Sequence, residues 1–112
     1  MKIAFFGDIV GKTGRKKIES SLQQYVLDEK VDFVVVNAEN ATAGAGLSAN
    51  HAEDLLKMSV DCITLGDHAF DNKEIIPFLE RTKQVVRPIN YSNDCPGPVS
   101  YTHLTLPTIC SV

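Results

Sequence analysis

The stretch FFGDIVGKTGR, from Phe5 to Arg15, joins an apolar run to a helical pattern. The run begins at Ile3, and Gly7 stops it after Phe6. Apolar residues then recur at the spacing of one helix face through the segment GRKKIESSLQQYVLDEK. They are Ile18, Leu22, Tyr25 and Val26. The stretch therefore predicts a strand, a glycine-bearing loop and an amphipathic helix.

The Gly-Lys-Thr of this loop invites comparison with a phosphate-binding P-loop. A P-loop needs four residues between its first glycine and the Gly-Lys-Thr, so that backbone N–H groups surround the phosphates. Here Gly7 and Gly11 lie one residue too close, and Phe6 stands where the glycine is required. The loop also carries a carboxylate, Asp8, which repels phosphate unless a cation lies between them. We conclude that the loop is not a P-loop.

The remaining chain repeats the alternation of strand and helix. DFVVVN, Asp32 to Asn37, is a β-branched run typical of a strand buried on both faces. Ser48 is a suitable N-cap for a helix that carries Ala52, Leu55 and Leu56, and CITL makes a third strand. The segment NKEIIPFLERT predicts a short helix despite Pro77, and QVV predicts a fourth strand.

The order β-α-β-α-β-α-β predicts an α/β fold, with a parallel sheet and right-handed crossovers.

At 112 residues, with 44% apolar and 22% charged residues, the chain suits one small soluble domain. Its net charge of -3 offers no basic surface for a nucleic-acid polymer. The start MKIAFFGD is too short for a signal or membrane segment, so we expect a cytoplasmic protein with no membrane association. Cys62, Cys95 and Cys110 are odd in number and widely spaced, which favours reduced thiols.

The composition changes abruptly near Pro98. The segment SYTHLTLPTICSV, Ser100 to Val112, has no charged residue and no clear periodicity. VSYTHLTLPT, which overlaps it, resembles the conceptual translation of a transposase-type sequencing adapter. We therefore expect residues 1–98 to be the N-terminal part of a domain and residues 99–112 to be a non-native tail. The alternative is that this segment is an ordinary uncharged terminal strand. A nucleotide sequence that runs through codon 99 without an adapter match would establish this alternative.

Polar side chains follow every predicted strand. In a parallel sheet these positions meet at one edge, where ligands bind. Carboxylate and amide oxygens with an imidazole suit divalent cations, and cations would let phosphate approach Asp8. Any one of these residues also suits a cap or a turn, so the prediction of a metal site depends on their convergence. The residues are Asp8, Glu39, Asn40, Asp67, His68, Arg87 and Asn90.

Four segments in order resemble one known family. FFGDIVGKTGR, NAENATAGAG, LGDHAFDNKEI and RPINY look like the N-terminal half of the YmdB-like metallophosphoesterases, from residue 1 to about residue 98. These belong to the calcineurin-like dinuclear metallophosphoesterase superfamily. The resemblance implies hydrolysis of small phosphodiesters, including 2′,3′-cyclic nucleotides. It also implies one half of an α/β/β/α sandwich and a pair of divalent metal ions, iron or manganese.

The resemblance also implies roles for five residues. Asp8 and Asn40 would bind the first metal, Glu39 would bridge both metals, and Asp67 would bind the second. His68 would donate a proton to the leaving alkoxide, which suits an imidazole. The family usually has Gly-Asn-His where this chain has Gly-Asp-His, and the extra carboxylate of Asp67 should raise the pKa of His68.

The family supplies three further metal-binding histidines and a second sheet from a C-terminal half that this sequence lacks. We therefore expect the chain alone to bind metals weakly and to be nearly inactive, while the full-length protein could form homo-oligomers. His51 is expected to be a solvated surface residue, and Lys12, Thr13 and Arg15 are expected to be solvated or to cap the first helix. The competing hypotheses are a non-catalytic, doubly wound nucleotide-binding module and a regulatory protein that retains the fold without turnover.

Overall fold

The computed structural model describes residues 1–42 and 46–101, so the predicted tail lies almost entirely outside the described residues. The boundary near residue 98 therefore stays a prediction. The described chain alternates four strands with three helices, as the sequence predicts. In order they are β1 (Ile3–Phe6), α1 (Gly11–Glu29), β2 (Phe33–Asn37), α2 (Ala49–Lys57), β3 (Cys62–Thr64), α3 (Ile75–Arg81) and β4 (Val85–Val86).

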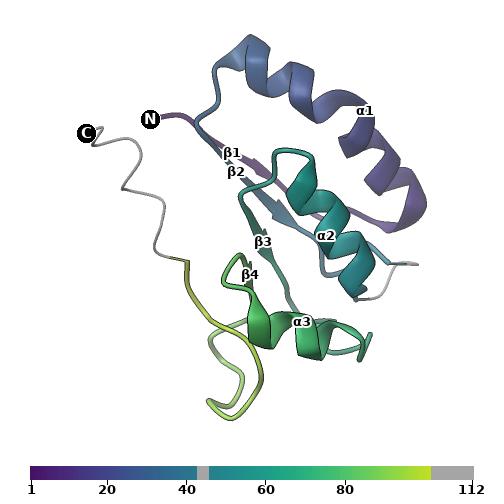
Figure 1. Ribbon diagram of the computed structural model, residues 1–112, viewed down its shortest axis with the longest axis vertical. Helices are drawn as coiled ribbons and strands as arrows, with labels where there is room; N and C mark the ends of the chain where they lie inside the picture. Colours follow the sequence, from purple (N-terminus) through teal and green to yellow (C-terminus); the bar gives the residue numbers. More distant parts are fainter. Residues whose placement is uncertain (43–45, 102–112) are drawn as a thin grey trace.

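All four strands are parallel and lie in the sheet in the order β1-β2-β3-β4. The three crossovers all move in the same direction along the sheet, and all three helices lie on one side of it (Figure 1). The predicted α/β class is thus confirmed. The carboxyl ends of β1, β2 and β3 consequently lie side by side at one edge.

The core lies between the sheet and the helices. Val36 pairs in register with Ile63, and Ile63 with Val85, and all three side chains are fully buried. The helices cover them with Leu22 of α1, Leu55 of α2 and Ile75, Phe78 and Leu79 of α3. This contiguous apolar layer fixes the positions of the strands, and so of the loops that follow them.

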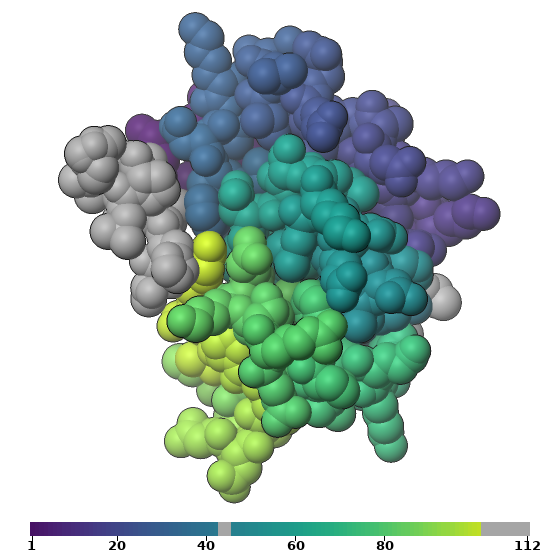
Figure 2. Space-filling view, viewed as in Figure 1, coloured from purple at the N-terminus to yellow at the C-terminus, as the bar shows by residue number. Residues whose placement is uncertain are grey.

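The opposite face of the sheet is covered only in part by the described residues. Ile3 and Phe5 on β1 are 48% and 62% exposed. Phe33 on β2 is buried, and its ring centroid lies 6.0 Å from that of Tyr101. The chain after β4 therefore returns across this face, and Figure 2 shows its yellow-coloured end against the green part of the molecule that contains α3.

The ends of the helices follow local chemistry. The Ser48 hydroxyl accepts a hydrogen bond from the His51 N–H at 3.2 Å, which confirms the predicted N-cap of α2. Pro77 is tolerated because it lies in the first turn of α3, where backbone N–H groups have no partner within the helix. Helix α1 begins at Gly11, earlier than the periodicity indicated, and Gly11 adopts a φ of 58°. Within the described ranges, no helix combines the length and apolar character needed to cross a membrane.

Candidate functional site

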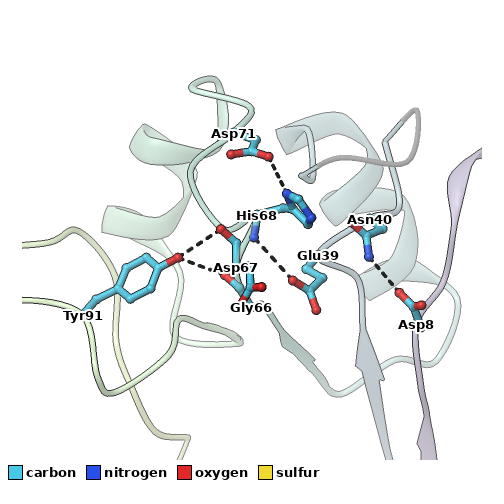
Figure 3. Close-up of polar contacts among 8 residues, drawn as sticks. All are labelled: Asp8, Glu39, Asn40, Gly66, Asp67, His68, Asp71 and Tyr91. Carbon is cyan, nitrogen blue, oxygen red and sulfur yellow. Dashed lines mark hydrogen bonds and ion pairs between the residues drawn. The ribbon is translucent and has the colours of Figure 1, made fainter.

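The five predicted site residues lie on the loops that follow β1, β2 and β3 (Figure 3). Asp8 comes from the first loop, Glu39 and Asn40 from the second, and Asp67 and His68 from the third. The contacts among them form two groups. Asp8 is bonded to Asn40, while Glu39 contacts the turn that carries His68.

Hydrogen bonds fasten the first loop to the second. The Asn40 side-chain amide donates to Asp8 Oδ1 at 2.9 Å, and the Gly11 N–H donates to the Asn40 carbonyl at 3.0 Å. Asp8 itself has a φ of 50°, in the left-handed region that few residues other than glycine and Asn/Asp occupy. A non-glycine residue held in this conformation is a feature that clusters at functional sites. The strained backbone directs an exposed carboxylate toward the second loop.

Glu39 lies against the third loop. Its Oε2 accepts a hydrogen bond from the His68 backbone N–H at 3.4 Å. A Cβ atom placed on Gly66 would lie 2.6 Å from Glu39 Cδ, a distance that real Cβ atoms do not tolerate. A side chain at position 66 would therefore require the Glu39 carboxylate to move from this position.

His68 is paired with a residue that the sequence reasoning did not identify. Its Nδ1 lies 2.6 Å from Asp71 Oδ2. The hydrogen bond to Asp71 raises the pKa of His68 above the usual value, with further contributions from the charges of Asp71, Glu39 and Asp67 and an opposing effect of desolvation. The predicted direction of the shift is confirmed, but Asp71 is its main cause and Asp67 a minor one. The His-x-x-Asp spacing was the signal available in the sequence.

A tyrosine from the RPINY segment supports the same turn. The Tyr91 hydroxyl is within hydrogen-bonding distance of the carbonyl oxygens of Gly66, at 3.2 Å, and Asp67, at 3.1 Å (Figure 3). Its ring packs against Phe70, with the centroids 5.4 Å apart. Tyr91 thus restrains the backbone on which His68 is mounted.

The remaining predicted residues differ in their surroundings. The Asp67 side chain is exposed and makes no hydrogen bond or ion pair within residues 1–42 and 46–101. Arg87 is buried, its N–H donates to the Pro98 carbonyl, and its guanidinium donates to the Pro88 carbonyl. These contacts anchor the start of the loop that follows β4. Asn90 is exposed.

The donor chemistry of this edge suits hard divalent cations, since carboxylate and amide oxygens predominate. However, no three His, Cys, Asp or Glu side chains of the described chain come close enough together to hold a metal ion. Asp8, Asn40 and Glu39 therefore fit a metal site in kind but form an incomplete ligand set.

The predictions for His51 and Arg15 are wrong. His51 is half-buried, and both of its ring nitrogens are engaged, by an Arg15 guanidinium nitrogen at 2.5 Å and by the Thr42 hydroxyl at 2.7 Å. Arg15 is likewise half-buried. Both residues lie at the junction of α1 and α2, and the packing of these two helices is what removes them from solvent.

Comparison with known proteins places this geometry in context. A sequence model described as YmdB-like protein matches residues 4–108. The chain is 36% identical over 97 residues to the 2′,3′-cyclic-nucleotide 2′-phosphodiesterase of Bacillus subtilis, covering 87% of this chain and 37% of that protein. It spans about a third of the length of the curated relatives that it matches, at 37%, 32% and 34%.

Two crystal structures resemble the fold. A hypothetical protein from Thermus thermophilus matches with a TM-score of 0.80 and 36% identity, covering 88% of this chain and 38% of that chain. A novel phosphatase from Mycoplasma pneumoniae matches with a TM-score of 0.77 and 38% identity, covering 84% of this chain and 35% of that chain. At these identities the likeness extends to sequence as well as fold.

Proposed function

Because the chain belongs to the YmdB-like protein family, we propose that it is the N-terminal part of a phosphoesterase that hydrolyses small phosphodiesters such as 2′,3′-cyclic nucleotides. The observation that carries this proposal is the His68–Asp71 pair, which lies beside Glu39 at the edge that also holds Asp8 and Asn40. A proton donor next to hard oxygen ligands is the arrangement that metal-assisted ester hydrolysis requires.

In this proposal Asp8, Asn40, Glu39 and Asp67 hold two divalent metal ions, iron or manganese. The ligand set in the described residues is incomplete, so this proposal includes further ligands from elsewhere in the protein. Bound divalent ions supply Lewis acidity toward a phosphoryl oxygen and make water a nucleophile at neutral pH. The chain's own carboxylates also set the local negative charge, which disfavours phosphate until cations are present.

His68 acts as the general acid. An ionised Asp71 can only accept a hydrogen bond, so Nδ1 of His68 carries the proton that joins the two residues. The protonated imidazole then has a second proton on Nε2 to give to the leaving alkoxide. By raising the pKa of His68, Asp71 keeps the ring protonated to higher pH.

We further propose that the 112-residue chain alone has little or no turnover. Its metal ligands are incomplete, and the face of the sheet that carries Ile3 and Phe5 is largely open within the described residues. A protein that contains this chain and has the full length of its relatives would supply the missing metal ligands and cover this face of the sheet.

The test measures hydrolysis of 2′,3′-cyclic AMP by such a full-length protein, before and after chelation and after addition of Mn²⁺ or Fe²⁺. We expect activity to disappear on chelation and to return with metal, and His68→Ala to reduce kcat by about 10²- to 10⁴-fold with metal content retained. Glu53→Gln, on the exposed surface of α2, is the matched control and should change little. Nucleotide binding that survives chelation, without hydrolysis, would instead favour the non-catalytic nucleotide-binding module.

A further inference from the structure

A second polar cluster lies beside the proposed site, between α1 and α2. It consists of Arg15, Thr42, Ser48 and His51, and it borders a cavity of about 160 Å³. Neither the general acid nor the proposed metal ligands belong to it. The side chains of Arg15, His51 and Thr42 and the backbone N–H of Ser48 form a continuous chain of hydrogen bonds, and Arg15, Thr42 and His51 are half-buried.

The direction of each hydrogen bond follows from the chemistry of the groups. Arg15 can only donate, so His51 Nε2 accepts from its guanidinium at 2.5 Å. His51 must then be neutral with its proton on Nδ1, which donates to the Thr42 hydroxyl at 2.7 Å. The same hydroxyl oxygen accepts the Ser48 N–H at 2.8 Å. Four groups are thereby joined with consistent donors and acceptors.

This chain of hydrogen bonds closes the loop that follows β2. Thr42 lies two residues after Asn40 and is joined through its hydroxyl to Ser48, the N-cap of α2. The Thr42 N–H donates to the Gly46 carbonyl at 3.0 Å, and the Gly46 N–H donates to the Glu39 carbonyl. Backbone bonds and the Thr42 side chain thus hold the two ends of one loop together, and this loop begins with Glu39 and Asn40.

We propose that Arg15, His51 and Thr42 form a positioning network that fixes the loop bearing Glu39 and Asn40 against α1 and α2. The inference rests on the proposed function of that loop as a metal-binding element. None of the three residues is among the proposed metal ligands. They act through the backbone, as supporting residues around metal ligands commonly do.

The surroundings of His51 favour its neutral form. Burial and the positive charge of Arg15 lower its pKa, while Asp54 opposes them. Lys12, Lys16 and Glu19 of α1 also line the cavity. A protonated ring would place a second cation against Arg15 and lose the acceptor at Nε2, so the network requires the uncharged imidazole.

The experiment compares Thr42→Val, which removes the hydroxyl at constant shape, with Thr42→Ser, which keeps it. A second pair is His51→Leu and His51→Gln, since the glutamine amide has both a donor and an acceptor. Glu53→Gln on the same helix is the control. The first readout is amide hydrogen exchange of Ser48 in the 112-residue chain, and the second is Mn²⁺ affinity of the full-length protein by calorimetry.

We expect Thr42→Val to accelerate Ser48 exchange roughly fivefold, the factor that corresponds to one hydrogen bond, and to weaken Mn²⁺ binding by about 10- to 100-fold. Thr42→Ser should preserve both values, and His51→Gln should retain more of them than His51→Leu. Unchanged Ser48 exchange in Thr42→Val overturns the network. Faster exchange with unchanged Mn²⁺ affinity overturns its positioning role and leaves the proposed function intact. If the unaltered protein binds neither Mn²⁺ nor Fe²⁺, the proposed function fails, and the positioning role that rests on it fails too.

Discussion

Gly66 lies directly against the carboxylate of Glu39, so that the third loop and the second loop share a space with no room for a methyl group. We expect Gly66→Ala to displace the Glu39 side chain or the turn before His68. A displacement of about 1 Å in a catalytic group costs on the order of 10²-fold in rate. Hydrolysis of a 2′,3′-cyclic nucleotide by the full-length protein measures the loss.

Gly7→Ala is the matched control for that substitution. A Cβ atom at Gly7 would meet only Phe5 Cε1, at 3.9 Å, and the residue has no positive φ. It should therefore leave both folding and rate nearly unchanged. Equal effects of the two substitutions would mean that the Gly66–Glu39 contact has no special role.

Asp71→Asn should shift the pH dependence of hydrolysis. The wild-type His68 pKa is raised chiefly by its hydrogen bond to Asp71, so removal of the carboxylate charge should lower it. Because the general acid must be protonated, the fall in kcat with rising pH should begin at a lower pH in the variant. The measurement is the pH–rate profile, and Asp28→Asn on the exposed surface of α1 is the charge-matched control. An unshifted alkaline limb would contradict the assignment of His68 as the acid.

The same pair affects stability. A histidine whose pKa is raised in the folded state stabilises the fold below its unfolded pKa, and this contribution disappears as the pH rises through the folded pKa. The melting temperature of the wild-type chain should therefore fall slightly as the pH rises from the unfolded to the folded pKa of His68. The melting temperature of Asp71→Asn should not show this fall. Melting temperatures measured across the range for both proteins test this expectation.

Tyr91→Phe should weaken the turn without disturbing its packing. The substitution removes the hydroxyl near the Gly66 and Asp67 carbonyls and keeps the ring against Phe70. We expect a loss of about 1 kcal/mol in the free energy of unfolding. Urea denaturation measures it, with Tyr25→Phe as control, because the Tyr25 hydroxyl makes no hydrogen bond within the described residues. Equal losses in both variants would show that the turn gains nothing from Tyr91.

The buried thiol of Cys62 should resist alkylation. Burial, with a smaller contribution from Asp61, raises the pKa of Cys62 to about 11, so little thiolate exists at a pH of about 8. Iodoacetamide treatment followed by peptide mass spectrometry should leave Cys62 unmodified in the native chain and label it in urea. Rapid native labelling would indicate that the face of the sheet around β3 opens readily.

The order of elements could be predicted from sequence because it depends on local signals. The β-branched run of β2 and the Ser48 N-cap both lie where the pattern indicated. The early start of α1 was missed because it depends on a contact between Gly11 and Asn40, which no local pattern encodes. The partners of His68 and His51 were missed for different reasons. Asp71 was available in a short motif, whereas Arg15 meets His51 only after α1 and α2 have packed.

The consecutive strand order has a consequence for synthesis of the protein. Each strand pairs with the one made just before it, so the sheet can grow strand by strand as the chain leaves the ribosome, without waiting for a distant segment. Of these four strands β1 is made first, and its outward apolar residues, Ile3 and Phe5, are the most exposed strand residues in the described part of the chain. Among the four strands, β1 therefore has the longest opportunity to associate with another chain before the sheet is complete, and a chaperone would be most useful there.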